Sequence, residues 1–214
     1  MTHEATQNLP TALLLLGPTG VGKTPLGEAL EGGGLWGRRC EHFDFGANLR
    51  RGAAGQLPNG LLSDDERRFL ANVLESGALL EDEQFAIAQK ILGSFMQERG
   101  IDAGTMIVLN GLPRHTGQAA AMQALVTVRA VISLTCTPET VLERVRTDAG
   151  GDRAGRGDDD PDAVRRRLAI YAERTSPLVA YYRERGAHIV VQPVGLTTTA
   201  DGLRTALQET PVPL

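Results

Sequence analysis

The residues with the most recognisable chemistry lie near the N-terminus, where residues 17–24 read Gly-Pro-Thr-Gly-Val-Gly-Lys-Thr. They directly follow an apolar run at 12–16 and precede a segment with helical spacing. A strand, a glycine-rich turn and a helix N-terminus form a cradle of backbone N–H groups for phosphate oxygens. The Lys23 ammonium group would reach β- and γ-phosphates there, and the Thr24 hydroxyl would hold Mg²⁺. The pattern predicts a P-loop; the alternative is an ordinary glycine turn after a buried strand.

Arginine side chains form a second set of residues suited to phosphate chemistry. Phosphoryl transfer needs positive charge and N–H donors around the transferring group more than it needs covalent chemistry. Each arginine alone is most simply a solvated surface charge, but Arg50 and Arg114 closely follow predicted strands. Ligands of parallel α/β sheets bind beyond the carboxyl ends of the strands, so we expect these two to face the P-loop. The clusters are Arg50 with Arg51, Arg114, Arg144 with Arg146, Arg153 and Arg156, and Arg165 to Arg167.

The elements that must position these residues alternate between strands and helices. Apolar runs typical of buried strands occur at 12–16, 42–45, 106–109, 130–135 and 188–192. Helical spacing or capping patterns occur at 63–74, 82–99, 161–174, 176–185 and 199–208, and Thr137-Pro138 predicts another helix start. This alternation predicts an α/β fold with a five-stranded parallel sheet covered by helices on both faces.

Two polar stretches fall outside this alternation. Residues 46–62 are rich in Gly, Arg and Asn and are predicted to form a loop. Residues 148–160 are glycine-rich, carry Asp and Arg, and have no apolar face. Because such a segment cannot pack into a core, we expect it to be mobile. It could be a plain surface loop, but an arginine-bearing segment after the fourth strand of a P-loop protein suggests a lid.

The overall composition limits the class of protein. With 214 residues, 42% hydrophobic and 22% charged, the chain is an ordinary globular domain. Its net charge of −4 gives no support to a nucleic-acid surface. No apolar stretch is long enough to span a membrane, residues 1–10 show no signal-peptide pattern, and two cysteines are too few for a disulfide framework. We therefore expect a cytoplasmic protein without nucleic-acid or membrane partners.

Three further stretches carry a resemblance to adenylate kinases. Residues 110–119, Asn-Gly-Leu-Pro-Arg-His-Thr-Gly-Gln-Ala, look like the family signature Asp-Gly-Phe-Pro-Arg…Gln-Ala. Residues 42–50, His-Phe-Asp-Phe-Gly-Ala-Asn-Leu-Arg, resemble the family segment Ser-Thr-Gly-Asp-Leu-Leu-Arg. Residues 155–160, followed by 165–168, are similar to the family lid, Gly-Arg-x-Asp-Asp and then Lys-Lys-Arg-Leu. The order and approximate spacing hold as far as Gly195, so the resemblance covers nearly the whole chain.

The resemblance implies a three-layer α/β/α P-loop kinase that forms one domain over residues 1–214. It also implies two mobile segments, a nucleoside-monophosphate-binding insert over about 46–80 and a short lid without zinc over about 147–161. Closure would bring several arginines together only when polyanionic ligands neutralise them, so binding of both nucleotides should drive it. We further expect a monomer, as is common in this family.

The resemblance implies roles for individual residues as well. The ATP-binding set comprises Gly17, Gly20, Val21, Gly22, Lys23, Thr24, Arg144 and Gly195, with Arg144 stacked on the adenine. Thr24 would hold the cofactor Mg²⁺, with Asn110 acting through a bound water. The acceptor-binding set comprises Phe45, Gly46, Arg50, Leu80, Arg114 and Gln118, with Gln118 on the base. The catalytic set comprises Lys23, Arg114, Arg156 and Arg167, and either Arg146 or Arg153 adds one more phosphate contact.

Three positions depart from the family pattern. Asn110 replaces the strand-end Asp, which keeps a hydrogen bond but loses the negative charge that orders Mg²⁺-bound water. Phe45 replaces a Thr beside the acceptor base, which adds bulk and removes a donor. Pro25 has no N–H, so the α-phosphate loses one backbone donor. Together these departures predict a slow or altered kinase.

The sequence thus predicts a nucleoside monophosphate kinase that moves the γ-phosphoryl group of ATP to an acceptor monophosphate, with AMP favoured by Gln118. Phe45 leaves dAMP, another nucleoside monophosphate or a phosphorylated metabolite open. We expect direct in-line transfer without a covalent enzyme intermediate. Two alternatives remain, a nucleotide-binding regulatory protein with lost or slow turnover and a P-loop kinase of a non-nucleotide acceptor.

Overall fold

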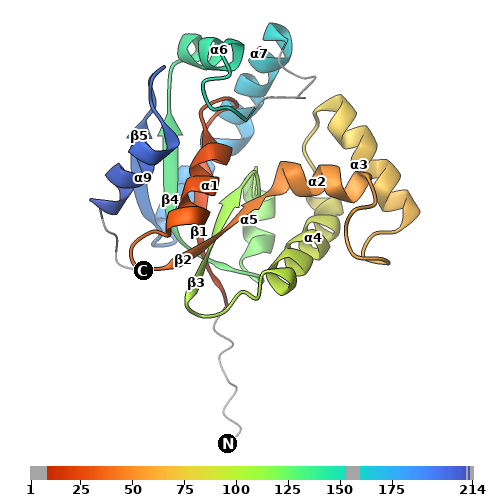
Figure 1. Ribbon diagram of the computed structural model, residues 1–214. Helices are drawn as coiled ribbons and strands as arrows, with labels where there is room; N and C mark the ends of the chain where they lie inside the picture. Colours follow the sequence, from red (N-terminus) through yellow and green to blue (C-terminus); the bar gives the residue numbers. More distant parts are fainter. Residues whose placement is uncertain (1–8, 153–159, 211, 213–214) are drawn as a thin grey trace, which may run out of the picture.

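The protein is built around one parallel sheet (Figure 1). The computed structural model describes residues 9–152, 160–210 and 212 of the chain. Five strands run in the order β2-β3-β1-β4-β5, and every neighbouring pair is parallel. They are β1 (Thr11–Leu16), β2 (Arg39–Asp44), β3 (Thr105–Asn110), β4 (Thr127–Thr135) and β5 (His188–Pro193). The prediction of a five-stranded parallel α/β sheet is confirmed, although the second strand ends at Asp44 and not at Phe45.

Helices cover both faces of this sheet because its central strands are apolar on both sides. In β1, Ala12, Leu14 and Leu16 pack into one hydrophobic cluster, whereas Leu13 and Leu15 pack into another. Successive side chains of a strand point to opposite faces. The first cluster includes residues of α4 (Phe85–Glu98), α5 (Thr116–Met122) and α8 (Leu178–Glu184), and the second includes residues of α1 (Lys23–Gly33) and α9 (Ala200–Gln208). The result is the predicted three-layer α/β/α architecture (Figure 1).

The helices alternate with the strands along the chain. Those between β1 and β3 are α1 (Lys23–Gly33), α2 (Phe45–Ala53), α3 (Asp64–Ser76), the 3₁₀ turn η1 (Asp82–Gln84) and α4 (Phe85–Glu98). Those after β3 are α5 (Thr116–Met122), α6 (Pro138–Arg146), α7 (Pro161–Ile170), the π-helical turn η2 (Tyr171–Thr175), α8 (Leu178–Glu184) and α9 (Ala200–Gln208). The predicted caps are present, since Ser63 and Glu66 form a capping box and Thr137 caps α6. The short helix α5 was not predicted.

The prediction of a loop over residues 46–62 was wrong for its first half, where α2 lies. Oδ1 of Asp44 accepts a hydrogen bond from the backbone N–H of Ala47 at 2.8 Å and caps this helix. Phe45 and Leu49 are buried on one side of it. A Cβ at Gly52 would lie 3.1 Å from the Leu62 and Leu70 side chains, so this glycine allows close packing against α3. Glycines that suggested a loop therefore serve helix packing.

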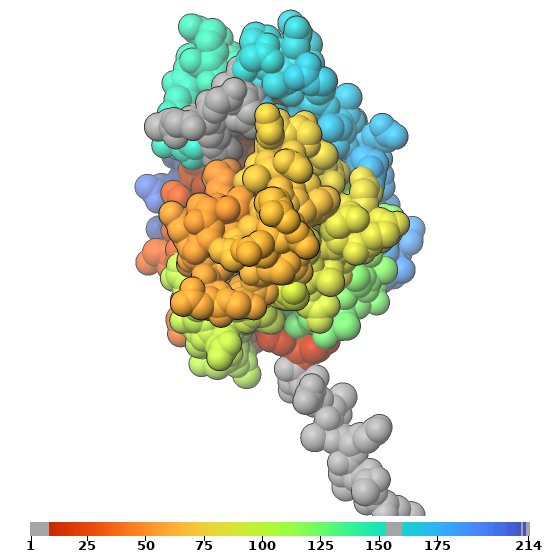
Figure 2. All heavy atoms as spheres, turned by 90° about the vertical axis from the view of Figure 1, so that its right-hand side faces the viewer, coloured from red at the N-terminus to blue at the C-terminus, as the bar shows by residue number. Residues whose placement is uncertain are grey.

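The helices α2 and α3 stand to one side of the sheet, beyond its β2 edge (Figure 1). They form the centre of the face shown in Figure 2, with α6 and α7 above them. This places the segment predicted as the acceptor-binding insert on one side of the strand ends. Of the predicted lid, residues 153–159 lie outside the described part of the chain.

Candidate active site

The P-loop occupies the carboxyl end of β1, as predicted, and leads directly into α1. Gly20 and Gly22 adopt positive φ angles of 73° and 101°, which L-residues with side chains rarely adopt. A Cβ at Gly20 would also lie 2.5 Å from a methyl carbon of Val145. Gly22 precedes α1 without a side-chain cap. The N-terminus of α1 can therefore receive an anion through its backbone N–H groups.

Lys23 holds its ammonium group over this loop. Its Nζ atom donates hydrogen bonds to the carbonyl oxygens of Gly17 and Pro18, both at 2.7 Å. Above it lies α7, from which a guanidinium nitrogen of Arg167 is 3.3 Å from the Thr19 hydroxyl. Two cationic side chains from distant parts of the sequence thus meet at the phosphate cradle.

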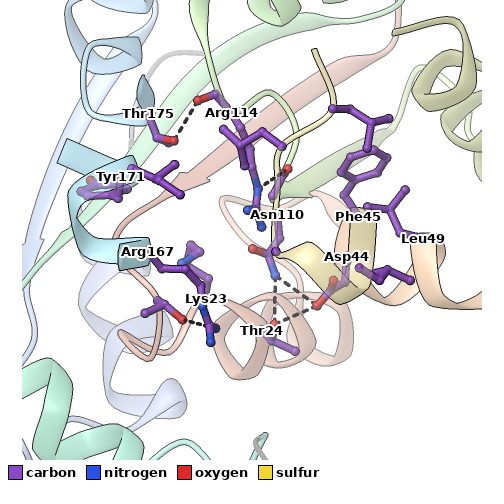
Figure 3. A pocket seen from close by; sticks show the side chains of 18 of the residues that line it. Lys23, Thr24, Asp44, Phe45, Leu49, Asn110, Arg114, Arg167, Tyr171 and Thr175 are labelled. Atoms are coloured by element: carbon purple, nitrogen blue, oxygen red, sulfur yellow. Dashed lines mark hydrogen bonds between the residues drawn. The ribbon is translucent and has the colours of Figure 1, made fainter. Parts of the chain in front are cut away.

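A compact polar triad lies beside Lys23, at the ends of β2 and β3 (Figure 3). The Thr24 hydroxyl donates to Oδ2 of Asp44 at 2.8 Å. The amide nitrogen of Asn110 lies 3.0 Å from the Thr24 hydroxyl oxygen and 3.3 Å from Oδ2 of Asp44. Hard cations such as Mg²⁺ prefer oxygen ligands and are commonly held by one or two protein groups together with substrate phosphates. The oxygens of this triad suit Mg²⁺ on that basis.

A buried histidine contacts the Asn110 member of the triad. The Nε2 atom of His42 lies 3.4 Å from the amide nitrogen of Asn110. Burial lowers the pKa of His42, whereas the Asp44 carboxylate acts in the opposite direction. The ring packs against α1 at Gly27, where a Cβ would come within 2.2 Å of Nε2. His42 thus fixes the end of β2 against the helix that carries the P-loop lysine.

Arg114 forms the opposite wall of the cleft. Its Nε atom donates to the Gly111 carbonyl oxygen at 3.1 Å, and its own carbonyl accepts from the Thr175 hydroxyl at 2.8 Å. Desolvation lowers the pKa of Arg114 from its ordinary value; the Asp44 carboxylate opposes this effect and the Arg167 guanidinium reinforces it. Two like charges near one desolvated space form a site that polyanions would stabilise.

One cleft of about 440 Å³ is lined by residues of the P-loop, the polar triad, Arg114 and Arg167, whereas His42 does not line it. The predicted site residues that line it are Gly17, Gly20, Gly22, Lys23, Thr24, Phe45, Gly46, Arg50, Leu80, Asn110, Arg114, Gln118 and Arg167. The cleft therefore joins the predicted ATP side to the predicted acceptor side. Arg156 and Arg153 lie outside the described residues.

The described site residues that do not line the cleft are Val21, Arg144, Arg146 and Gly195, and their roles stay predictions. Val21 is fully buried and packs in the core. Buried Arg144 donates from Nε to the Gly20 carbonyl oxygen at 3.2 Å and from a terminal nitrogen to the Gly195 carbonyl oxygen at 2.7 Å. It thus fastens the P-loop to the segment after β5, and its stacking on adenine stays a prediction. Arg146 is exposed and pairs with Glu143 on its own helix, away from the residues that line the cleft.

On the predicted acceptor side of the cleft, the Gln118 side chain is hydrogen-bonded to neighbouring backbone groups. Gln118 is buried; its amide nitrogen donates to the Leu80 carbonyl oxygen at 2.8 Å, and its amide oxygen accepts from the Arg114 backbone N–H at 2.8 Å. Phe45 is only 3% exposed and lies against Phe43, with ring centroids 6.0 Å apart. Arg50, by contrast, is exposed on α2. The amide predicted to read the acceptor base thus also ties the Leu80 segment to the Arg114 turn.

Asp44 is the functional candidate that the sequence analysis did not identify. It lies inside the quoted stretch 42–50 and immediately before Phe45, where its role as the cap of α2 and as a partner of Thr24 was not visible. The signal that could have found it is a carboxylate at the carboxyl end of an apolar run, next to a strand that ends in Asn110.

Comparison with known proteins shows the family to which this chain is similar. The adenylate kinase family model matches residues 15–187. The adenylate kinase of Xylella fastidiosa (strain M23) is 32% identical over 192 residues, which cover 86% of this chain and 91% of that protein. The adenylate kinase of Xanthomonas oryzae pv. oryzae (strain MAFF 311018) is 32% identical over 206 residues, which cover 91% and 98%. A gluconokinase structure from Sinorhizobium meliloti 1021 overlaps 95% of each chain, with a TM-score of 0.48 and 15% identity. Within the described residues, no helix combines the length and apolar character needed to cross a membrane.

Proposed function

The chain belongs to the adenylate kinase family of ATP-dependent phosphotransferases, and we propose that it transfers the γ-phosphoryl group of ATP to AMP. The observation that carries this proposal is that the P-loop, Lys23, Arg114 and Gln118 line one cleft. The two walls are separate phosphate-binding surfaces, one made of backbone N–H groups and one of guanidinium groups. A nucleoside triphosphate on the first and a monophosphate on the second would place donor and acceptor in the same desolvated space.

The residues of the cleft divide the work of transfer between them. The P-loop and Lys23 bind the ATP phosphates, and Arg50 and Arg114 bind the acceptor phosphate through bidentate hydrogen bonds. Arg167 reaches over the P-loop from α7 and stabilises charge on the transferring group. The acceptor phosphate is already a nucleophile, so no general base is required and positioning supplies much of the rate. When bound, Mg²⁺ would be held at Thr24, with Asn110 acting through a bound water, and would neutralise phosphate charge.

AMP is favoured because Gln118, which the family resemblance assigns to the acceptor base, lines the cleft and bridges the Leu80 carbonyl and the Arg114 backbone N–H. The bonds to Leu80 and Arg114 use one N–H and one oxygen lone pair of the Gln118 amide, so a second N–H and a second lone pair are left for the base.

The test is transfer from Mg·ATP to a panel of AMP, dAMP, GMP, CMP, UMP and dTMP, with Lys23→Ala as the blank. Formation of ADP from AMP at the highest kcat/KM, lost in the Lys23→Ala variant, is expected. Transfer that survives in this variant would contradict the catalytic assignment. A higher kcat/KM with another monophosphate would contradict AMP as the acceptor while keeping the kinase.

Two observations favour a second candidate, a kinase of a smaller phosphorylated acceptor without a purine. The Gln118 amide has both ends bonded within the chain, and the bulky Phe45 lies where the family has Thr. This candidate predicts ATP binding without AMP binding, and unchanged acceptor selectivity in Gln118→Ala. Calorimetric titration of AMP into the protein, with and without an ATP analogue, separates the two.

A further inference from the structure

We propose that Asp44, at the end of β2, supplies the negative charge that holds Mg²⁺ beside ATP, in place of the strand-end carboxylate that Asn110 lacks. The inference rests on the proposed function, because it assigns a residue of the same site. It goes beyond that function by moving the metal-binding carboxylate from one strand to its neighbour.

The pairing of β2 with β3 allows a carboxylate at the end of either strand to reach the same place. Asp44 and Asn110 are direct partners in the parallel register of β2 and β3, the last pair before both strands end. Both side chains turn toward the P-loop hydroxyl of Thr24, at 2.8 Å from Asp44 Oδ2 and 3.0 Å from the Asn110 amide nitrogen (Figure 3). Either position could therefore present a carboxylate to the same hydroxyl.

The two residues also form a complementary pair. The Asn110 amide nitrogen lies 3.3 Å from Asp44 Oδ2, so the amide donates to the carboxylate. An aspartate at position 110 would instead place a second carboxylate against Asp44, where like charges repel. In this chain the pair carries a single carboxylate, and it is on β2.

The family segments quoted above indicate the same exchange. With Arg50 aligned to the Arg of Ser-Thr-Gly-Asp-Leu-Leu-Arg, the family has Ser where this chain has Asp44. The family signature begins with Asp where this chain has Asn110. At these two touching side chains one carboxylate is lost and one is gained, while the Asp of the first family segment is Ala47 in this chain. The predicted weakening of Mg²⁺ ordering by Asn110 is therefore offset within the site.

A simpler reading is that Asp44 only caps α2 through Ala47. The two roles use different oxygens, because Oδ1 accepts from Ala47 and Oδ2 faces Thr24 and Asn110. Asparagine and serine also cap helices well, so Asp44→Asn and Asp44→Ser remove the charge and keep the cap. A helix cap alone would not need the carboxylate, whereas a metal site would.

The experiment measures Mn²⁺ binding to the full chain by electron paramagnetic resonance, with a non-hydrolysable ATP analogue present. Mn²⁺ takes the same oxygen ligands as Mg²⁺. We expect Asp44→Asn and Asp44→Ser to weaken nucleotide-dependent Mn²⁺ binding by about 10- to 100-fold, the usual cost of losing a group that supports a metal site. The double variant Asp44→Ser/Asn110→Asp should recover most of the affinity, because it returns the carboxylate to β3. Asp102→Asn is the control, since Asp102 precedes β3 at the opposite end of that strand.

Thermal unfolding of each variant shows whether a decrease in Mn²⁺ affinity comes from the binding site or from unfolding of the protein. Unchanged Mn²⁺ affinity in both folded Asp44 variants would overturn the inference while leaving the kinase proposal intact. The inference would also be overturned if the double variant bound Mn²⁺ as weakly as Asp44→Ser does, because a carboxylate on β3 would then not replace the one on β2. Absence of nucleotide-dependent Mn²⁺ binding in the unmodified protein would instead contradict the proposed function itself.

Discussion

The two walls of the cleft are built in different ways. The wall that we propose binds ATP, here called the ATP wall, is made mainly of the contiguous residues 17–24. Hydrogen bonds from Lys23 Nζ to carbonyl oxygens five and six residues earlier hold it together. The acceptor wall, formed by Leu80, Arg114 and Gln118, is assembled from separate elements. The hydrogen bond from Gln118 to the Leu80 carbonyl, for example, joins residues 38 positions apart. The first wall is organised mainly by local bonds and is tied to the rest of the chain at Gly20 by Arg144, whereas the second depends on how α2, α3 and α5 pack. Changes to the Lys23 side chain should therefore affect chemistry, and changes on the acceptor wall should affect selectivity and stability together.

The largest effect is expected for Lys23→Ala, which removes the ammonium group from the ATP wall. Losing a preorganised charge at the transferring group costs about 10²–10³-fold or more in kcat. Steady-state kinetics with Mg·ATP and the preferred acceptor would measure the loss. Lys90→Ala is the matched control, because this other lysine pairs with Glu66 on the surface. Equal activity of the two variants would contradict the role of Lys23.

Arg114→Ala should break the acceptor wall while leaving the ATP wall in place. The substitution removes the guanidinium group, whose charge-assisted bidentate contacts contribute about 3 kcal/mol. We therefore expect the KM for the acceptor to rise and kcat/KM to fall by about 10²-fold. The dissociation constant of the ATP analogue should change little. A variant that loses ATP affinity and acceptor affinity equally would show that the two walls are not independent.

Gly20→Ala should strain the ATP wall through its backbone. The new Cβ would meet Val145 at 2.5 Å, and the φ angle of 73° is unfavourable for alanine. A cost of about 1–3 kcal/mol in the free energy of unfolding is expected, together with weaker ATP binding. Gly60→Ala is the control, since its φ angle is 80° and its Cβ would meet nothing within 4 Å. Urea unfolding and nucleotide titration of both variants would separate crowding from backbone strain.

Gln118→Ala should lower stability as well as acceptor discrimination. It leaves the Arg114 backbone N–H without its side-chain partner and removes one contact of the Leu80 carbonyl, which also lies 3.1 Å from His115 Nε2, at a cost of about 1–3 kcal/mol. The ratio of kcat/KM for AMP to that for CMP should fall toward one. An unfolding free energy equal to that of the unmodified protein would show that these two bonds do not hold the acceptor wall.

The smallest effect is expected at the surface contact between η1 and η2. Arg174 and Glu81 form a bidentate pair at 2.7 and 3.2 Å, and both side chains are more than a third exposed. Because solvent screens such pairs, a double-mutant cycle of Arg174→Gln and Glu81→Gln should give a coupling of about 0.2–1 kcal/mol. A coupling well above this range would mean that the pair holds the acceptor wall more firmly than its exposure implies.

Much of the fold followed from local patterns. The apolar runs identified the five strands because a parallel sheet is buried on both faces. Ser63 and Thr137 marked helix starts because capping is a short-range interaction. The prediction failed over 46–53, where Gly46 and Gly52 suggested a loop and the packing of α2 against α3 decided for a helix.

The candidate site divides in the same way. The P-loop was determined by the sequence alone, because contiguous residues and a fixed strand-turn-helix geometry are sufficient to build it. That Arg114 and Arg167 meet near it depends on the sheet order and on α7, although a family resemblance could anticipate both. The contact between Thr24, Asp44 and Asn110 was decided only by the tertiary structure. These residues are 20 and 86 positions apart from Thr24, and only the pairing of β2 with β3 places their side chains at one hydroxyl.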